Sequence, residues 1–147
     1  MAKPVTTTFG KFRVLLGDDS DPIAYAAPCG FTSKSFNRTK NLSEQVIPDC
    51  DDPDAAADII RDVVSKDWTV GGEGLLAAGS VPTWEAAYDS DVSIPVKIEI
   101  EFSTGTLTYT GRAHLNTFNI TGEQGGRVTA SIEMSADGGL TRASTLP

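Results

Sequence analysis

In residues 92–103 every second side chain, from Val92 to Phe102, is a large apolar one. This alternation constrains the fold more than any other feature of the chain. Because successive side chains of a β-strand point to opposite faces, the pattern predicts a strand with one buried face and one solvated face. The apolar members are Val92, Ile94, Val96, Ile98, Ile100 and Phe102. The residues between them are Ser93, Pro95, Lys97, Glu99, Glu101 and Ser103.

Two more strands are predicted to continue this sheet. Thr104-Gly105 suits a two-residue hairpin turn, and pairing across that turn places Glu99 opposite Thr110. The glycine-rich segment 121–126 leads to a third strand over 127–135, which places His114 opposite Glu133. Residues 92–135 are therefore predicted to form an antiparallel meander with an apolar face and a long polar face.

The first part of the chain is less regular. Residues 11–17 read as a short strand that ends at the turn-forming residues 18–22, and the polar residues 38–41 are predicted to form the tip of a hairpin. In that register Cys29 would lie opposite Cys50, and we expect both thiols to stay reduced in a cytoplasmic chain. A disulfide between them would form only after exposure to an oxidant.

The middle of the chain combines a strand with helical signals. Asp54 has the character of a helix N-cap, so a short helical turn is considered near 54–61, followed by a strand to about Leu76. The glycines within 71–74 are predicted to mark a bulge in that strand. Pro82 opens a helix over about 80–90, in which Trp84, Ala87 and Tyr88 share one face.

These elements predict a mainly β chain, an antiparallel β-sandwich or barrel-forming arrangement of sheets with one short helix at about 80–90. Its length of 147 residues favours one domain. The predicted core residues are Trp68, Trp84, Ile94, Ile98, Ile100, Leu115 and Ile132.

The charge balance bears on partners and location. The chain has 12 basic and 20 acidic residues, a net charge of −8, so we expect no direct grip on nucleic acid, which needs clustered cations. No apolar run approaches the roughly 18–20 residues that a membrane helix needs. The N-terminus lacks the apolar stretch of a signal peptide, so we expect synthesis in the cytoplasm and no membrane partner.

No catalytic, metal or cofactor site is expected. His114 is the sole histidine and has no nucleophile tied to it by a motif. One histidine and two cysteines match no zinc pattern, and the acidic residues 49–54 fail the calcium-loop pattern. Residues 72–77 fit the glycine spacing of a dinucleotide fingerprint, but no βαβ unit surrounds them. We therefore predict a protein that is not an enzyme.

Three stretches carry a resemblance to a known family. They are the segment 66–76 (KDWTVGGEGLL), the pair of segments 111–118 (GRAHLNTF) and 122–132 (GEQGGRVTASI), and the closing segment 135–141 (SADGGLT). Together with the helix at 80–90, these stretches resemble phage tail tube proteins, a type of subunit also found in gene transfer agent tails. The likeness is one of strands and glycines over residues 60–141, and looser over 11–59.

The resemblance implies an architecture and a role. Residues 1–10 would be an N-terminal arm and residues 11–147 a single tail-tube-like β domain. Six copies would join their sheets into a ring, and stacked rings would form the virion tail tube, through which DNA passes without specific binding. Partners would be further copies of the chain and, by family resemblance, the tape-measure, tail terminator and distal tail proteins.

The same resemblance gives roles to two sets of residues. The polar face of the meander would line the lumen, and the weakly patterned segments 1–10 and 38–58 would bridge stacked rings. The lumen candidates are Lys97, Glu99, Glu101, Thr108, Thr110, Arg112, Asn116 and Glu133. The inter-ring candidates are Thr6, Thr7, Thr8, Arg38, Thr39, Lys40, Asn41, Asp49, Asp51, Asp52 and Asp54.

Two alternatives stay open on the sequence alone. A tail terminator or head–tail completion protein would form a single ring and stop there. A ligand-binding β-sandwich would need an exposed aromatic platform at Trp68 or Trp84, whereas burial of both indoles would indicate core packing.

Overall fold

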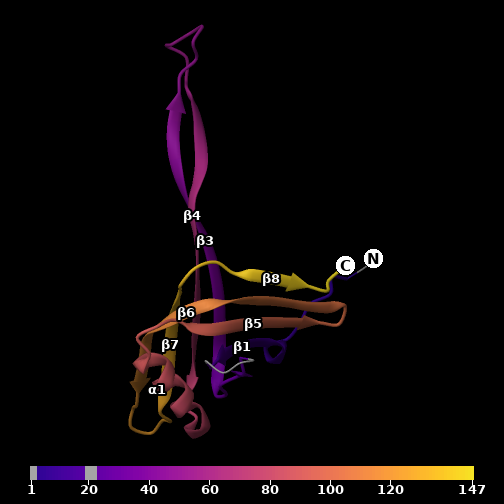
Figure 1. Cartoon of the computed structure of the whole chain (residues 1–147), viewed down its shortest axis with the longest axis vertical. Helices are drawn as coiled ribbons and strands as arrows, with labels where there is room; N and C mark the ends of the chain where they lie inside the picture. Colours follow the sequence, from indigo (N-terminus) through magenta and orange to yellow (C-terminus); the bar gives the residue numbers. More distant parts are fainter. Residues whose placement is uncertain (1–2, 19–22) are drawn as a thin grey trace.

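The computed structural model describes residues 3–18 and 23–147; the predicted turn at 18–22 lies mostly outside them. Eight antiparallel strands form one sheet, which one short α-helix covers at one end (Figure 1). The mainly β chain with one short helix is thus confirmed. The elements are the 3₁₀ turns η1 (Phe9–Lys11) and η2 (Ala78–Ser80), the helix α1 (Val81–Asp89), and the strands β1 (Phe12–Gly17), β2 (Tyr25–Ala26), β3 (Phe31–Ile47), β4 (Asp58–Leu75), β5 (Ile94–Phe102), β6 (Gly105–Thr121), β7 (Thr129–Ala136) and β8 (Thr141–Ser144).

The strand order is β2-β1-β5-β6-β7-β4-β3, and β8 pairs with the first half of β6. The predicted meander is therefore the centre of the sheet. Two projections leave the body in different directions: the β3–β4 hairpin, and the far ends of β5 and β6 with β1 and β8 beside them (Figure 1). The C-terminal end of the chain lies beside the second projection.

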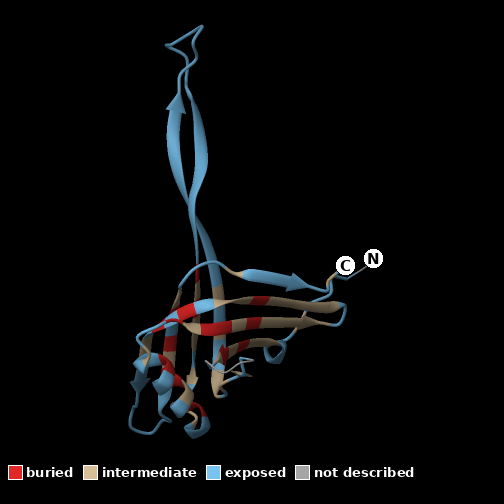
Figure 2. Cartoon of the chain, in the orientation of Figure 1, coloured by how far each residue is buried: buried red, intermediate tan, exposed pale blue. Residues whose placement is uncertain are grey.

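The core forms where the curled sheet brings β1 and β3 toward each other beneath α1. Ile98, Val96, Val70 and Met134 come from three different strands and are fully buried. Figure 2 shows buried residues confined to the body, whereas the outer part of the β3–β4 hairpin is exposed throughout. Of the predicted core residues, Trp68, Trp84, Ile98, Leu115 and Ile132 are buried, and Ile94 and Ile100 are half-buried.

The helix closes one end of the core through its aromatic residue. Pro82 stands in its first turn, where a missing N–H is harmless, and Trp84 and Ala87 are buried. Trp84 packs edge-on against Phe31 of β3, with 5.4 Å between the ring centroids. Tyr88, predicted to share the helix face of Trp84 and Ala87, is 55% exposed.

The predicted hairpin tip at residues 38–41 is wrong. Lys40 lies opposite Lys66 in the middle of the β3–β4 ribbon, and the true connection spans residues 48–57. Both faces of this ribbon are exposed, so polar residues occur all along it and polarity does not mark a turn.

The predicted pairing of the two cysteines fails with that register. The amide N–H of Cys29 donates a hydrogen bond to the hydroxyl of Ser80 in η2, whereas Cys50 belongs to the hairpin connection. Both thiols are free and exposed.

The helical turn considered near 54–61 is also absent. Residues 58–61 begin strand β4, as the β-branched pair Ile59-Ile60 favours. The bulge predicted within 71–74 lies in the partner strand instead, because β3 carries the extra residue Thr32 between Phe31 and Ser33. The pairing of β4 with β7 runs through the glycines without interruption.

The meander is correct in its faces and wrong in its register. Ile98 pairs with Tyr109 and Glu99 with Thr108, so the turn is Ser103-Thr104 and every predicted pair shifts by two residues. An even shift leaves each side chain on its predicted face. On the other edge of β6, His114 pairs with Ser135 rather than with Glu133, because the connection to β7 is placed differently from the prediction, and Asn116 forms a bulge in this pairing.

Candidate functional site

The polar face of β5 and β6 gathers six of the eight lumen candidates. Pairing places Glu99 opposite Thr108, Lys97 opposite Thr110, and Glu101 opposite Thr106, a threonine that sequence reasoning did not select. Arg112, on the same face, donates hydrogen bonds from its guanidinium to the hydroxyl and the carbonyl oxygen of Ser93. The face thus combines hydroxyl groups and carboxylates with the cations Lys97 and Arg112.

Basic residues of η1 and β1 neutralise the carboxylates of this face. Arg13 pairs with Glu99 at 2.6 Å and with Glu101 at 3.0 Å, and Lys11 approaches Glu101 at 4.0 Å. These side chains are partly exposed, so each pair stabilises the fold by at most about 1 kcal/mol. Arg13 was missed as a site residue, although its place between Phe12 and Val14 in an alternating strand puts it on the polar face.

The last two lumen candidates lie away from the other six. Asn116 is the bulged residue of β6 and accepts a hydrogen bond from Ser135. Glu133 belongs to β7, where with Glu73 and several hydroxyl groups it lines an open polar hollow of about 320 Å³. The polar face therefore continues from β5 and β6 onto β7 and β4.

The three threonine candidates of the N-terminal segment differ in their contacts. The Thr7 hydroxyl donates to the carbonyl oxygen of Glu101 at 2.5 Å, which fixes the chain to the end of β5. Thr6 and Thr8 are exposed. Phe9, in η1, lies beneath the ammonium of Lys34 at 4.7 Å from the ring centroid.

The remaining inter-ring candidates belong to the β3–β4 hairpin. Arg38 stands where the hairpin leaves the body and donates to the Tyr109 hydroxyl at 3.1 Å. Thr39, Lys40 and Asn41 follow on β3, and Asp49, Asp51, Asp52 and Asp54 belong to the connection at the far end.

The hairpin exposes apolar side chains that no other part of the described chain covers. Leu42 and Val63 are a cross-strand pair, exposed to 48% and 52%, and Val46 and Ile59 form the next apolar pair. A two-stranded ribbon of this kind is only marginally stable alone in water. Exposed apolar surface bordered by polar residues is typical of protein–protein contacts.

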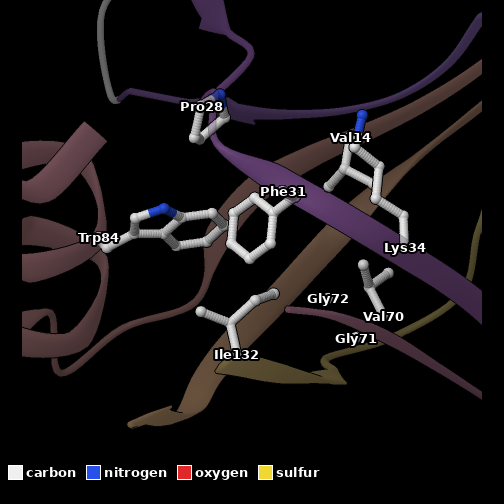
Figure 3. A pocket seen from close by; sticks show the side chains of 9 residues that line it. All are labelled: Val14, Pro28, Phe31, Lys34, Val70, Gly71, Gly72, Trp84 and Ile132. Atoms are coloured by element: carbon white, nitrogen blue, oxygen red, sulfur yellow. The ribbon is translucent and has the colours of Figure 1, made fainter. Parts of the chain in front are cut away.

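The interior leaves little space for a small ligand. The gap of Figure 3, between β1, β3, β4 and α1, measures about 10 Å³, close to the volume that one water needs. Trp68 and Trp84 are 4% and 3% exposed, so neither indole offers a stacking platform.

Lys34 stands at the edge of this gap. Its ammonium donates to the carbonyl oxygen of Phe12 at 3.0 Å. Desolvation by burial, and then the nearby Arg13 charge, lower the pKa of Lys34 from its ordinary 10.5.

Residues 3–18 and 23–147 hold no group of three or more acidic, histidine or cysteine side chains arranged to bind a metal ion. No helix in those ranges has the length and apolarity to span a bilayer.

Comparisons with known proteins identify similar chains. The family described as phage tail tube protein matches residues 7–142. The tail of an empty gene transfer agent particle, refined with C6 symmetry, gives a TM-score of 0.70 at 10% identity over 94% of this chain and 99% of the other. The SPP1 tail tube gives 0.64 at 12% identity, over 98% and 81%.

A third solved structure, the baseplate of the anti-feeding prophage, gives a TM-score of 0.62 at 11% identity, covering 97% of each chain. Identities this low show a shared fold. No curated protein sequence matches the chain.

Proposed function

This chain belongs to the phage tail tube protein family, whose members are structural components of the virion tail, and on that premise we propose that six copies form a ring and that rings stack into the tube. DNA would pass through this tube without being bound specifically. The observation that carries the proposal is the uncovered β3–β4 hairpin, which projects from the body (Figure 2) and whose exposed residues include large apolar side chains.

The second projection supports closure of the ring. Its strands β1, β5, β6 and β8 form a four-stranded portion of the sheet, in which β8 has an edge without a partner strand in the described chain. Free strand edges favour pairing with another chain, and closure into a continuous barrel removes them. We infer that neighbouring subunits join their sheets here.

The polar face of β5 and β6 suits the lumen. Arg13 and Lys11 offset the charges of Glu99 and Glu101, and hydroxyl groups occupy much of the rest. Six copies would carry a net charge of six times −8, about −48, which would repel passing phosphates. A lumen of this chemistry would let DNA move without adhering.

The hairpin and the segment around Thr6, Thr7 and Thr8 would connect one ring to the next. The tape-measure, tail terminator and distal tail proteins would be the partners at the inside and the ends of the tube. The subunit would be made in the host cytoplasm and act as a structural protein without catalytic activity.

Electron microscopy of the purified protein, concentrated stepwise, tests the proposal. Hollow tubes built of stacked rings are expected. Single rings that never stack would instead favour the role of a tail terminator. Particles without rings at any concentration would contradict self-assembly of the purified subunit.

A further inference from the structure

One face of the β3–β4 hairpin carries an ordered sequence of charges. This face, here called the hairpin face, continues the core side of the sheet outward along β3 from Arg38, the partner of Trp68, because residues separated by two along a strand share a face. On β4 a bulge at Val64 keeps Val63 opposite Leu42. It carries, from the body outward, the cross-strand pairs Lys40 and Lys66, Leu42 and Val63, Glu44 and Arg61, and Val46 and Ile59.

The innermost pair places two positive charges directly opposite each other. Lys40 and Lys66 are both exposed, and no carboxylate of the described residues forms an ion pair with either. Like charges opposite each other destabilise a ribbon. The pair, called the basic neck below, is therefore uncompensated within the described subunit.

The far end of the hairpin has the opposite charge. The connection and the first residue of β4 hold Asp49, Asp51, Asp52, Asp54 and Asp58, and residues 48–60 include no lysine or arginine. We call residues 49–54 the acidic tip. Between the neck and the tip, Arg61 and Glu44 neutralise each other at 2.9 Å.

We propose that the acidic tip of one copy docks on the basic neck of a copy in the next ring, with the apolar pairs of the hairpin face packed in the same contact. The proposal rests on the proposed stacking of rings. The occupant is a second copy of this chain, because the tip supplies the negative charge that the neck lacks.

A tip-to-neck contact can connect ring after ring, because it joins different surfaces of identical subunits. Such a contact builds an open stack when it does not close into a ring. Nine residues separate Lys40 from Asp49 on β3 and its extension, a reach of roughly 30 Å at about 3.3 Å per residue. The contact can therefore span from one subunit to another along the hairpin direction.

Charge reversal tests the contact in the full-length protein. Lys40→Glu with Lys66→Glu reverses the neck, and Asp51→Lys, Asp52→Lys and Asp54→Lys together reverse the tip. Each set alone should raise the protein concentration at which tubes appear by about tenfold or more, because like charges would then meet. All five changes together should restore assembly, since complementarity returns with both signs exchanged.

A single substitution outside the hairpin controls for net charge. Lys66→Glu and Arg127→Glu change the charge equally, and Arg127 is exposed in the loop before β7. We expect only Lys66→Glu to weaken assembly. Circular dichroism of each variant checks that its fold is retained.

The possible failures are distinguishable. If the wild type forms no tubes, the proposed function fails before the variants are compared. If the wild type forms tubes and Lys66→Glu has no more effect than Arg127→Glu, the tip-to-neck contact is wrong while the tube remains. Loss of assembly without rescue by the fivefold variant would also overturn the contact, as would a discrete dimer, which indicates a two-fold contact between hairpins.

Discussion

Neighbouring residues of β5 have opposite surroundings. Ile98 is fully buried, whereas the carboxylate of Glu99 reaches Arg13 on the polar face. The alternation in the sequence predicts this difference residue by residue. Arg13 escaped notice because its ion pair joins strands that are far apart in the chain, which alternation within one strand does not reveal.

Ile98→Asp should prevent stable folding. An unpaired charge in this part of the core costs about 3–5 kcal/mol, comparable with the whole stability of many domains. Thermal unfolding followed by circular dichroism measures the effect. Glu99→Gln is the matched control and should lose at most about 1 kcal/mol, because its ion pair is partly exposed. Equal melting of Ile98→Asp and wild type would show that the faces are assigned wrongly.

Lys34 should make the stability of the fold depend on alkaline pH. Burial, then Arg13, lower its pKa below the ordinary 10.5, so the unfolded chain binds more protons between the lowered pKa and 10.5. The contribution of Lys34 to the free energy of unfolding therefore rises with pH across that window.

Lys34→Met should remove this contribution. Urea unfolding at several pH values is expected to show a stability difference, variant minus wild type, that falls as the pH rises toward 10.5. Lys3→Met, at an exposed position, controls for loss of a lysine. Parallel stability curves for Lys34→Met and wild type would contradict the desolvation of Lys34.

Among the elements, the central strands could be predicted and the β3–β4 hairpin could not. The meander has a core-facing side, so alternation marks its strands. Alternation does not fix how β5 and β6 are aligned, however, because that register depends on whether the turn is Ser103-Thr104 or Thr104-Gly105. The hairpin contacts no core over its outer half. Its strand residues therefore lack the pattern that burial imposes, and Arg38–Asn41 resembled a turn.

Gly74 shows how closely β4 approaches the start of β3. A Cβ at this position would lie 2.4 Å from the carbonyl oxygen of Gly30 and 2.6 Å from the Cα of Phe31. Both are backbone atoms, so the strands would have to separate. This approach, beside the bulge at Thr32, explains why a glycine occupies the strand.

Gly74→Ala should therefore destabilise the fold by about 1–3 kcal/mol, as overpacking does. Chemical denaturation provides the measurement. Gly79→Ala in η2 is the control, because its Cβ would meet nothing within 4 Å. A Gly74→Ala variant as stable as the control would contradict the close approach.

At the scale of the whole molecule, the resemblance to a known family indicated a role for the chain, which the periodicity of its side chains could not. Alternation predicts a polar sheet face but does not say what that face contacts. Likewise, the exposed apolar residues of the hairpin are explained only by the proposed contact with other copies of the chain. The family match over residues 7–142 supplies this context. The proposed roles in lining the lumen and in joining rings depend on neighbouring subunits. The packing of the core within one subunit does not determine where those neighbours lie.

A cryo-electron microscopy reconstruction of tubes assembled from the purified protein tests the central claim most directly. The account predicts stacked six-membered rings with Lys97, Glu99 and Thr108 facing the lumen, and each hairpin in contact with the next ring. Rings that do not stack, or a tube in which this polar face lies outside and the hairpins are free in solvent, would contradict it.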